Sequence, residues 1–267
     1  MSATISSDPI SQRFASLARD GRRGLVTYLT AGHPDPDRSV ELMRALEEGG
    51  ADVIEIGVPF SDPLADGPVI QASSQRALEH GMDFAQVLDV VRRAKVQVPV
   101  VLFSYLNPIM AAGPDALARA HDAGVHGILI TDLPLGADPA REEWLGTGPL
   151  AFVRLVAPTT PLERMRDIAQ HGRGFVYLIS RLGVTGMQRD MASDLPACIN
   201  RLKSVTTLPV CVGFGVSTAE HARALGRLAD GIVVGSAIVR AAETSIDAAR
   251  DLTRELRQAL DASAPAA

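Results

Sequence analysis

The sequence predicts a (β/α)8 barrel in which an extra N-terminal helix caps the barrel floor. Three observations lead to this fold class. Eight short apolar runs alternate with longer amphipathic segments, the chain of 267 residues suits eight such units, and no G-x-G-x-x-G fingerprint follows the first run. An open doubly wound sheet would also fit the alternation, but it usually carries that fingerprint. No linker or shift in composition interrupts the pattern, so we expect one domain over residues 1–267.

The eight predicted strands are short runs rich in Val, Ile and Leu. Such nearly continuous apolar runs are typical of strands covered on both faces, and regular intervening helices indicate parallel βαβ units. The runs are 25–30, 52–58, 98–105, 127–132, 151–156, 174–180, 209–215 and 231–236.

The segments between these runs repeat apolar residues at helical spacing, as Val40, Met43 and Leu46 do. The clearest predicted helices are 38–49, 83–95, 114–123, 161–170 and 217–226. Gly49-Gly50 is a stop signal for the first of them, and Ser217 with Glu220 three residues later predicts a capping box at the last.

An additional helix is predicted before the first strand, over residues 9–20. Pro9 directly after Ser7 and Asp8 is a typical helix start. Ile10, Phe14 and Leu17 fall on one face, which we expect to pack on the barrel floor.

The composition is that of an ordinary globular protein and argues against several classes of function. Apolar residues make up 46% and charged residues 21%, which argues against long disorder. With 26 basic and 31 acidic residues the net charge is −5, and no basic block stands out, so nucleic acid is not the expected partner. We expect neither export nor membrane insertion, because the N-terminus lacks a signal pattern and no apolar stretch is long enough. Two cysteines, Cys198 and Cys211, favour a reducing compartment and hence the cytoplasm.

Glu55 is the strongest candidate for chemistry, because it interrupts the apolar second strand. Alternation places Ile54 and Ile56 against the helices and directs Glu55 into the barrel. Burying an unpaired carboxylate costs on the order of several kcal/mol, so we expect the pKa of Glu55 to be raised, as suits a general acid/base. The competing interpretation is a structural ion pair with Arg154 of the fifth strand.

Asp66 is the second candidate. It lies in the loop 59–70 after the second strand. This loop and the loop 181–196 after the sixth strand are the two long loops on the predicted catalytic face. Asp62 or Asp66 alone would most simply be a turn-capping residue. Proximity to Glu55 favours function for Asp66, since two carboxylates at one strand mouth can divide acid and base roles.

Glycine-containing segments follow the sixth, seventh and eighth strands, at 183–186, 213–215 and 235–236. Barrels bind phosphate at these positions through backbone N–H groups and the start of a short helix, here at Ser236. A single glycine there would be an ordinary turn residue. The three together predict a phosphate site.

Other mechanisms lack the residues that they need. The two lysines, Lys95 and Lys203, lead into strands at their amino ends, which argues against a Schiff base. No nucleophile motif occurs, and Cys211 is interpreted as core. The six histidines lack ligand spacing, so no metal is expected, and His33 at the catalytic face is interpreted as exposed. They are His33, His80, His121, His126, His171 and His221.

Residues 55–71, E-I-G-V-P-F-S-D-P-L-A-D-G-P-V-I-Q, resemble the signature of the tryptophan synthase alpha chain family. The likeness continues at 30–34, 171–186, 212–217 and 235–239. It implies retro-aldol cleavage of indole-3-glycerol phosphate to indole and glyceraldehyde 3-phosphate, without cofactor or metal. Glu55 then matches the family's acid/base carboxylate, and Asp66 the aspartate that accepts the indole N–H. Thr185 matches the threonine that bonds this aspartate when the two loops close.

The resemblance also implies the remaining ligands and a partner. The phosphate ligands would be Gly186, Gly213, Gly215, Gly235 and Ser236, and the indole walls would be Tyr28, Phe103, Leu129, Tyr177 and Val233. Tyr28 stands where Phe is usual and His33 where Asp is common, and we expect neither to touch the carboxylate pair. A beta chain would dock on the catalytic face at Pro59, Asp62 and Asn107-Pro108, giving an alpha2beta2 heterotetramer.

Three alternatives remain open on the sequence alone. A stand-alone indole-3-glycerol-phosphate lyase would run the same chemistry and release free indole. A non-catalytic regulatory barrel should have lost Glu55 or Asp66, and both are present. A phosphosugar isomerase would need a His and a Lys beside its Glu base, and the Lys is missing.

Overall fold

The computed structural model describes residues 8–179, 194–213 and 215–263. Eight strands form a closed barrel in chain order, and all eight neighbouring pairs, including β1 with β8, are parallel. The strands are β1 Gly24–Thr30, β2 Val53–Gly57, β3 Val100–Ser104, β4 Gly127–Ile130, β5 Ala151–Val156, β6 Val176–Ile179, β7 Val210–Gly213 and β8 Gly231–Val234.

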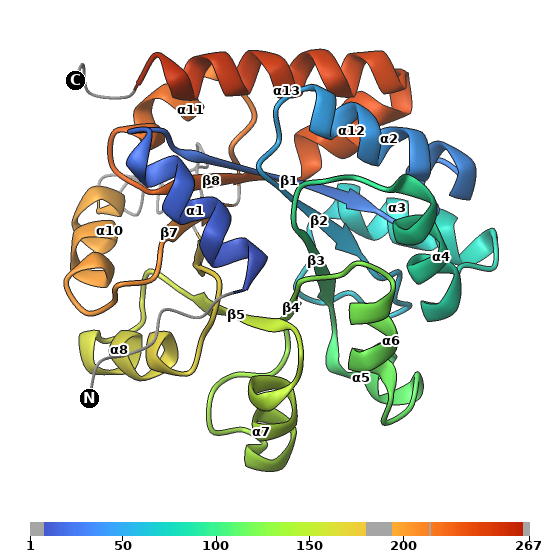
Figure 1. Ribbon diagram of the computed structural model, residues 1–267, viewed down its shortest axis with the longest axis horizontal. Helices are drawn as coiled ribbons and strands as arrows, with labels where there is room; N and C mark the ends of the chain where they lie inside the picture. Colours follow the sequence, from blue (N-terminus) through green and yellow to red (C-terminus); the bar gives the residue numbers. More distant parts are fainter. Residues whose placement is uncertain (1–7, 180–193, 214, 264–267) are drawn as a thin grey trace.

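Helices surround the strands, and α1 lies across one end of the barrel (Figure 1). The helices are α1 Pro9–Arg19, α2 Pro36–Glu48, α3 Pro68–Glu79, α4 Phe84–Ala94, α5 Leu106–Ala111, α6 Ala116–Asp122, α7 Pro139–Thr147, α8 Leu162–Gln170, α10 Leu195–Lys203, α11 Ala219–Gly226, α12 Ser236–Thr244 and α13 Ile246–Asp261. Within the described ranges, no helix is long and apolar enough to cross a membrane.

The predicted barrel is confirmed strand by strand, and each of the five predicted inter-strand helices is present. The predicted capping box at α11 is wrong. Thr218 caps this helix, because its hydroxyl accepts the N–H of His221 at 3.2 Å while its backbone is extended. The helix therefore begins one residue later than expected, which places Glu220 one position too early for the box and leaves Ser217 outside the helix.

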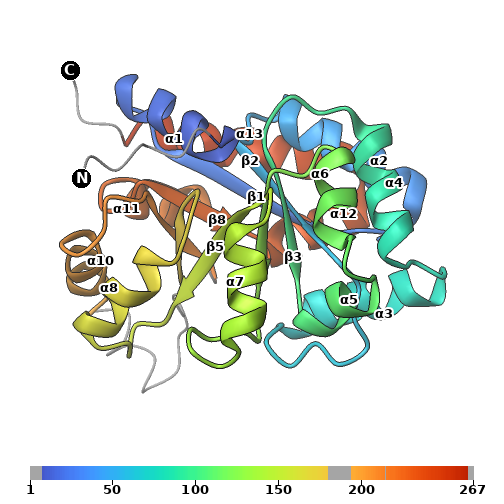
Figure 2. The same ribbon diagram turned by 60° about the horizontal axis from the view of Figure 1, so that its bottom comes forward.

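The floor helix α1 is confirmed, and the barrel is shaped to receive it. Asp8 caps the helix by accepting the N–H of Ser11 at 2.9 Å. Two of its buried side chains enter the floor where strands begin with glycine: a Cβ at Gly24 would lie 2.5 Å from Phe14, and one at Gly127 would lie 2.6 Å from Ile10. In Figure 2, α1 lies on the upper side and α3 and α5 toward the lower side, where the loops after β2 and β3 lead.

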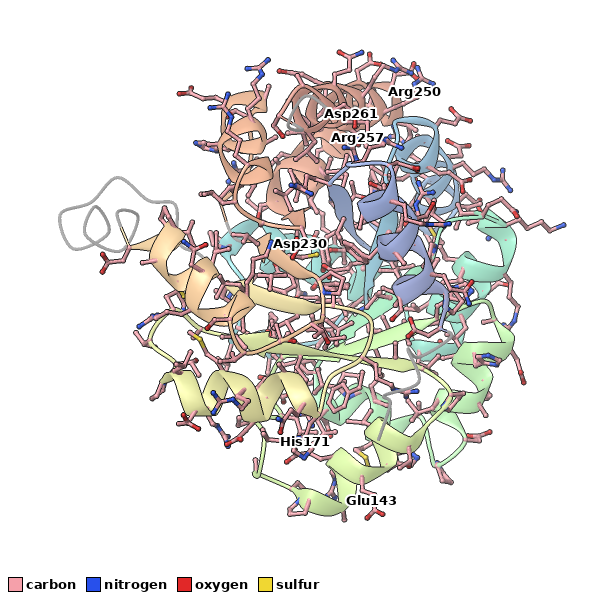
Figure 3. The ribbon with its side chains drawn as sticks, turned by 60° about the vertical axis from the view of Figure 1, so that its left-hand side comes forward. Glu143, His171, Asp230, Arg250, Arg257 and Asp261 are labelled. Carbon is pink, nitrogen blue, oxygen red and sulfur yellow. The ribbon has the colours of Figure 1, made fainter. Side chains whose placement is uncertain are left out.

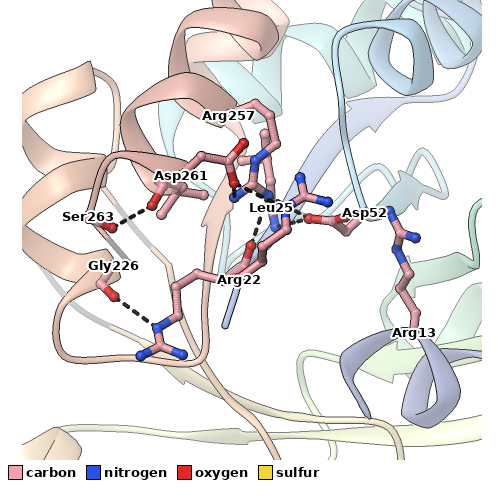
Figure 4. A network of polar contacts seen from close by, with 10 residues as sticks. Arg13, Arg22, Leu25, Asp52, Gly226, Arg257, Asp261 and Ser263 are labelled. Carbon is pink, nitrogen blue, oxygen red and sulfur yellow. Dashed lines mark hydrogen bonds and ion pairs between the residues drawn. The ribbon is translucent and has the colours of Figure 1, made fainter. Parts of the chain in front are cut away.

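A buried ionic network fixes the start of β2 at this floor (Figure 4). The Asp52 carboxylate accepts the backbone N–H of Leu25 at 2.8 Å, Arg257 Nη1 at 2.8 Å and Arg13 Nη2 at 2.6 Å. Arg257 also binds Asp261 on its own helix at 2.8 Å, and the two side chains lie together in Figure 3. Charge-assisted hydrogen bonds of this kind are strong and directional. They hold β1, β2, α1 and α13 together three residues before Glu55.

Two apolar clusters follow from the alternation of the strands. The outer cluster lies between barrel and helices and includes Ile54 and Ile56 of β2. The inner cluster fills the barrel and includes Val53 of the same strand, together with Phe14 from the floor helix. Glu55 shares the inward parity of Val53 and is only 1% exposed, so the predicted orientation of β2 is confirmed.

Candidate active site

A cavity of about 300 Å³ opens above the inner cluster, at the carboxyl ends of the strands. It gathers nine of the residues selected from the sequence. They are Tyr28, Glu55, Asp66, Phe103, Tyr177, Gly215, Val233, Gly235 and Ser236.

Glu55 forms the base of this cavity, and none of the described residues forms an ion pair with it. Its Oε1 is buried and has no hydrogen-bond partner among the described residues. Burial raises the pKa of Glu55 to about 8, because removal from water penalises the charged carboxylate. The competing ion pair is wrong: Arg154 Nη2 binds Glu142 at 3.0 Å instead, on the outer side of β5. Glu55 is therefore a carboxyl group that holds its proton at neutral pH.

Asp66 lies at the cavity wall, half-buried in the loop between β2 and α3. Its Oδ2 accepts the hydroxyl of Tyr105 at 3.1 Å, and that hydroxyl in turn accepts the N–H of Ala65 at 2.8 Å. Burial raises the pKa of Asp66 to about 6, while the Tyr105 hydrogen bond opposes the rise. Within the described part of the chain this carboxylate accepts a side-chain hydroxyl rather than capping a turn, and Asp66 lines the cavity.

Tyr105 is a site residue that the sequence analysis missed, although it ends the third predicted strand. Its ring also packs on Phe60 of the same loop, with centroids 5.1 Å apart. It therefore holds both the carboxylate and the backbone of the loop after β2, which makes it a positioning residue for Asp66.

Aromatic side chains also line the cavity. Tyr28 and Phe103 meet edge to face with ring centroids 5.3 Å apart. Tyr28 is nearer to the carboxyl groups than expected, because its Cα is the register partner of Glu55 in the β1–β2 ladder and both side chains line the cavity. The Tyr28 hydroxyl binds Thr30 at 3.2 Å. Flat apolar walls beside a few polar groups suit a planar ring system.

His33 is not the exposed residue that the sequence suggested. Its side chain is 1% exposed, because the loop after β1 folds it against α12, with Nε2 3.6 Å from Glu243 Oε1. Burial lowers the pKa of His33, and the nearby Glu243 opposes that shift. His33 does not line the cavity. The difference from the family pattern at position 33, His where Asp is common, therefore lies beside the site and not in it.

The part of the cavity at the start of α12 has the features of an anion site. Helix α12 starts at Ser236, directly after Gly235, and no described side chain caps its first turn. Uncapped N–H groups at a helix start bind anions well. Gly215, with φ of 91°, adds backbone from the loop after β7. Thr185 and Gly186, like most of the loop 181–196, lie outside the described residues.

Two residues selected from the sequence do not line the cavity. Leu129 is fully buried in the inner cluster beneath it. Gly213 lies beside Tyr177 at the end of β7, where an added Cβ would come within 2.2 Å of the tyrosine oxygen and 2.5 Å of Cζ. A missing side chain at position 213 thus makes room for the aromatic wall.

The Gly213→Ala variant should therefore lose activity. The added methyl group would push the Tyr177 ring out of its present position, and the ring cannot move away easily because it is buried. We expect KM for the substrate to rise by about tenfold or more, in line with the sensitivity of sites to misplacement of about 1 Å. Steady-state kinetics with a crystal structure of the variant would check this. Unchanged kinetics with the ring in place would contradict it.

Six further cavity residues were not selected as site residues from the sequence. Gly67 and Ile70 come from the start of α3, Val216 and Ser217 from the loop before α11, and Ala237 and Arg240 from α12. Arg240 belongs to the segment that follows Gly235 and could have been noticed as a charge four residues after Ser236.

The remaining candidates from the sequence lie elsewhere. Lys95 caps the end of α4, and Lys203 at the end of α10 binds Asp230 at 2.7 Å, so both lie at the amino ends of strands as expected. Over the described ranges, no three His, Cys, Asp or Glu side chains come together in a group that could hold a metal ion.

Comparisons with known proteins agree with this geometry. The family model described as "Tryptophan synthase alpha chain" matches residues 14–265. The tryptophan synthase alpha chain of Laribacter hongkongensis is 47% identical over 261 residues, covering 95% of this chain and 99% of that protein. The alpha chain of Burkholderia thailandensis is 46% identical over 268 residues, covering 97% and 99%.

Solved structures give the same result. Tryptophan synthase subunit alpha from Legionella pneumophila superposes with a TM-score of 0.88 at 35% identity, covering 96% of this chain and all of that one. A chain of tryptophan synthase from M. tuberculosis gives a TM-score of 0.87 at 33% identity, covering 96% and 99%.

Fold and cavity together define a class of (β/α)8-barrel enzymes in which two carboxyl side chains and an uncapped helix start line one cavity. The comparisons narrow this class to one family. The chain belongs to the tryptophan synthase alpha chain family, and its activity is that of a lyase acting on indole-3-glycerol phosphate.

Proposed function

We propose that the cavity around Glu55 cleaves indole-3-glycerol phosphate to indole and glyceraldehyde 3-phosphate, with Glu55 as general acid and base and Asp66 as the acceptor for the indole N–H. The observation that supports this most directly is the buried Glu55 carboxyl group at the base of a cavity with aromatic walls, whose Oε1 has no hydrogen-bond partner among the described residues. Its raised pKa keeps the proton available at neutral pH.

The proton balance of the reaction fits one shuttling carboxyl group. Glu55 first gives its proton to indole C3, which leaves positive charge on the ring. The carboxylate then takes the proton of the adjacent glycerol hydroxyl, the bond between C3 and the glycerol carbon breaks, and its electron pair returns to the ring. Indole and an aldehyde leave, and Glu55 ends protonated as it began.

Asp66 stabilises the charged ring in this scheme. With its pKa near 6 the carboxylate is ionised at neutral pH, whereas Glu55, with a pKa near 8, is protonated. Two carboxyl groups whose environments separate their pKa values can take opposite roles. The indole N–H donates to Asp66, and the interaction strengthens as C3 becomes protonated.

The phosphate of the substrate binds at the start of α12, to backbone N–H groups around Gly235 and Ser236 and in the loop at Gly215. The aromatic residues Tyr28, Phe103 and Tyr177, with Val233, hold the indole. The family resemblance adds Gly186 and the backbone of Gly213 at the end of β7 to the proposed phosphate ligands, and Thr185 as the proposed partner of Asp66 when the site closes. Leu129 supports the indole pocket from beneath.

The partner is the tryptophan synthase beta chain, in an alpha2beta2 complex that receives the indole. A groove of about 440 Å³ on the catalytic face contains Pro59, Asn107 and Pro108, three of the four residues expected at this contact. Nearby Leu64 is 94% exposed, and Met110 on α5 is also exposed, which provides apolar surface for a partner.

The cytoplasm is the proposed compartment. Both cysteines are free thiols and both are buried. This agrees with a reducing environment.

The decisive experiment is incubation of the purified chain with indole-3-glycerol phosphate, with indole and aldehyde measured separately. Stoichiometric release of both supports the proposal, and no release with or without a beta chain overturns it. Strong activation by an added beta chain favours the synthase subunit. High turnover of the chain alone would favour the stand-alone lyase.

A further inference from the structure

One charged residue of the cavity has no part in the scheme above. Arg240 lies on α12, one turn after Ser236, and lines the same cavity. Among the described residues of the cavity wall it is the single cation, while Glu55 and Asp66 are acidic. Its side chain is exposed, so water solvates the charge and a ligand entering the cavity can reach it.

The natural protein partner for Arg240 is bound elsewhere. Glu243 stands three residues later on the same helix, a spacing that commonly gives an ion pair. Its Oε1 instead accepts Arg76 Nη1 of α3 at 3.2 Å and lies 3.6 Å from His33 Nε2. Over the described ranges, neither a hydrogen bond nor an ion pair joins the Arg240 guanidinium to another group. Arg76 and His33 thus occupy the Glu243 carboxylate that could otherwise pair with Arg240.

Helix geometry directs this free charge toward the start of α12. Side chains on a helix lean toward its N-terminus, and four residues correspond to an axial rise of about 6 Å. An arginine side chain is long enough to cover most of that distance. The Arg240 guanidinium can therefore approach an anion seated on the backbone N–H groups near Ser236.

We propose that Arg240 is a specificity-determining residue that selects the doubly charged phosphate of the substrate. The inference rests on the proposed function, in which the phosphate binds at the start of α12. The helix start offers only about half a positive charge, whereas a phosphate monoester carries close to two negative charges at neutral pH. Arg240 supplies a full positive charge. This charge offsets the repulsion between the phosphate and ionised Asp66. It acts on binding and leaves the proton transfers to Glu55.

The test compares Arg240→Gln, Arg240→Lys and the matched control Arg227→Gln. Arg227 is exposed at the end of α11, which leads into the amino end of β8, away from the cavity. Each protein is assayed with indole-3-glycerol phosphate, with the same compound lacking its phosphate, and with inorganic phosphate as a competitive inhibitor. The salt dependence of KM is recorded in parallel.

Arg240→Gln should raise KM, and the inhibition constant of inorganic phosphate, by about three- to tenfold, as expected for one partly solvated charge interaction. The kcat should stay within about twofold, the phosphate-free substrate should be unaffected, and the rise in KM should shrink at high salt. Arg240→Lys should recover most of the loss, and Arg227→Gln should behave as the parent protein.

The proposal is overturned if KM for the phosphorylated substrate is unchanged, or if the substrate without phosphate loses as much. It also fails if kcat falls while phosphate inhibition stays the same. Direct calorimetric binding of inorganic phosphate separates this inference from the proposed function. If the parent chain binds phosphate more tightly than Arg240→Gln but cleaves nothing, only the proposed function fails; if the two bind alike or not at all, the role of Arg240 is rejected.

Discussion

The Glu55→Gln variant should lose cleavage activity and gain stability. Both effects are expected for a buried carboxyl group that holds a proton in the folded protein. Activity should fall by about 10³-fold or more, because one group supplies both the acid and the base and each such role is worth about 10²–10⁴. Glutamine has nearly the shape of glutamic acid but neither gives nor takes this proton, so substrate binding should survive.

The stability gain follows from the sign of the pKa shift. The pKa of Glu55 rises from 4.5 in its ordinary state to about 8 in the fold, so the folded state binds more protons than the unfolded state between these values. The parent protein therefore loses stability as pH rises through that range. Glu55→Gln should be more stable by up to about 3 kcal/mol at pH 7 and nearly equal at pH 4. Urea unfolding at both pH values checks this, and a destabilised variant at pH 7 would count against a buried, unpaired carboxyl group.

Asp66→Asn should lower kcat by two to three orders of magnitude, roughly the cost of removing one charge-stabilising group from a site. Asparagine can still accept a hydrogen bond but carries no charge, so ground-state binding should change little while the charged ring is no longer stabilised. Steady-state kinetics with the phosphorylated substrate measures both quantities.

Asp62→Asn is the matched control for that experiment. Asp62 lies four residues earlier in the same loop, is exposed, binds Ser61 at 2.5 Å and does not line the cavity. In the isolated chain it should retain full activity. Equal losses in the two variants, or an unfolded Asp66→Asn protein, would show that Asp66 serves the loop and not the reaction.

The sequence was most informative where a periodic pattern repeats. Inward parity along β2 is set by the two-residue period of the strand, and it placed Glu55 correctly because Ile54 and Ile56 had to face the helices. The same applies to Ile10, Phe14 and Leu17 of the floor helix. Such positions are determined by neighbours close in sequence.

Tertiary contacts decided the positions that the sequence did not reveal. His33 is buried because α12 covers it, and Tyr105 reaches Asp66 across 39 residues. The residues next to His33 and Tyr105 in the sequence do not predict these contacts. The proximity of Gly213 to Tyr177 likewise depends on the β6–β7 register. Thr218 rather than Ser217 caps α11, a difference of one residue in the helix start. Capping propensity alone does not decide between two such neighbouring residues.

The protonation state of Glu55 is the centre of this account, and infrared difference spectroscopy measures it directly. Spectra of the parent protein minus Glu55→Gln, recorded from pH 5 to pH 10, isolate the carboxyl band of this one side chain. We expect a protonated carboxyl band that persists at pH 7 and titrates with a midpoint near 8. A band already lost by pH 6 would show an ordinary ionised glutamate and would contradict the mechanism.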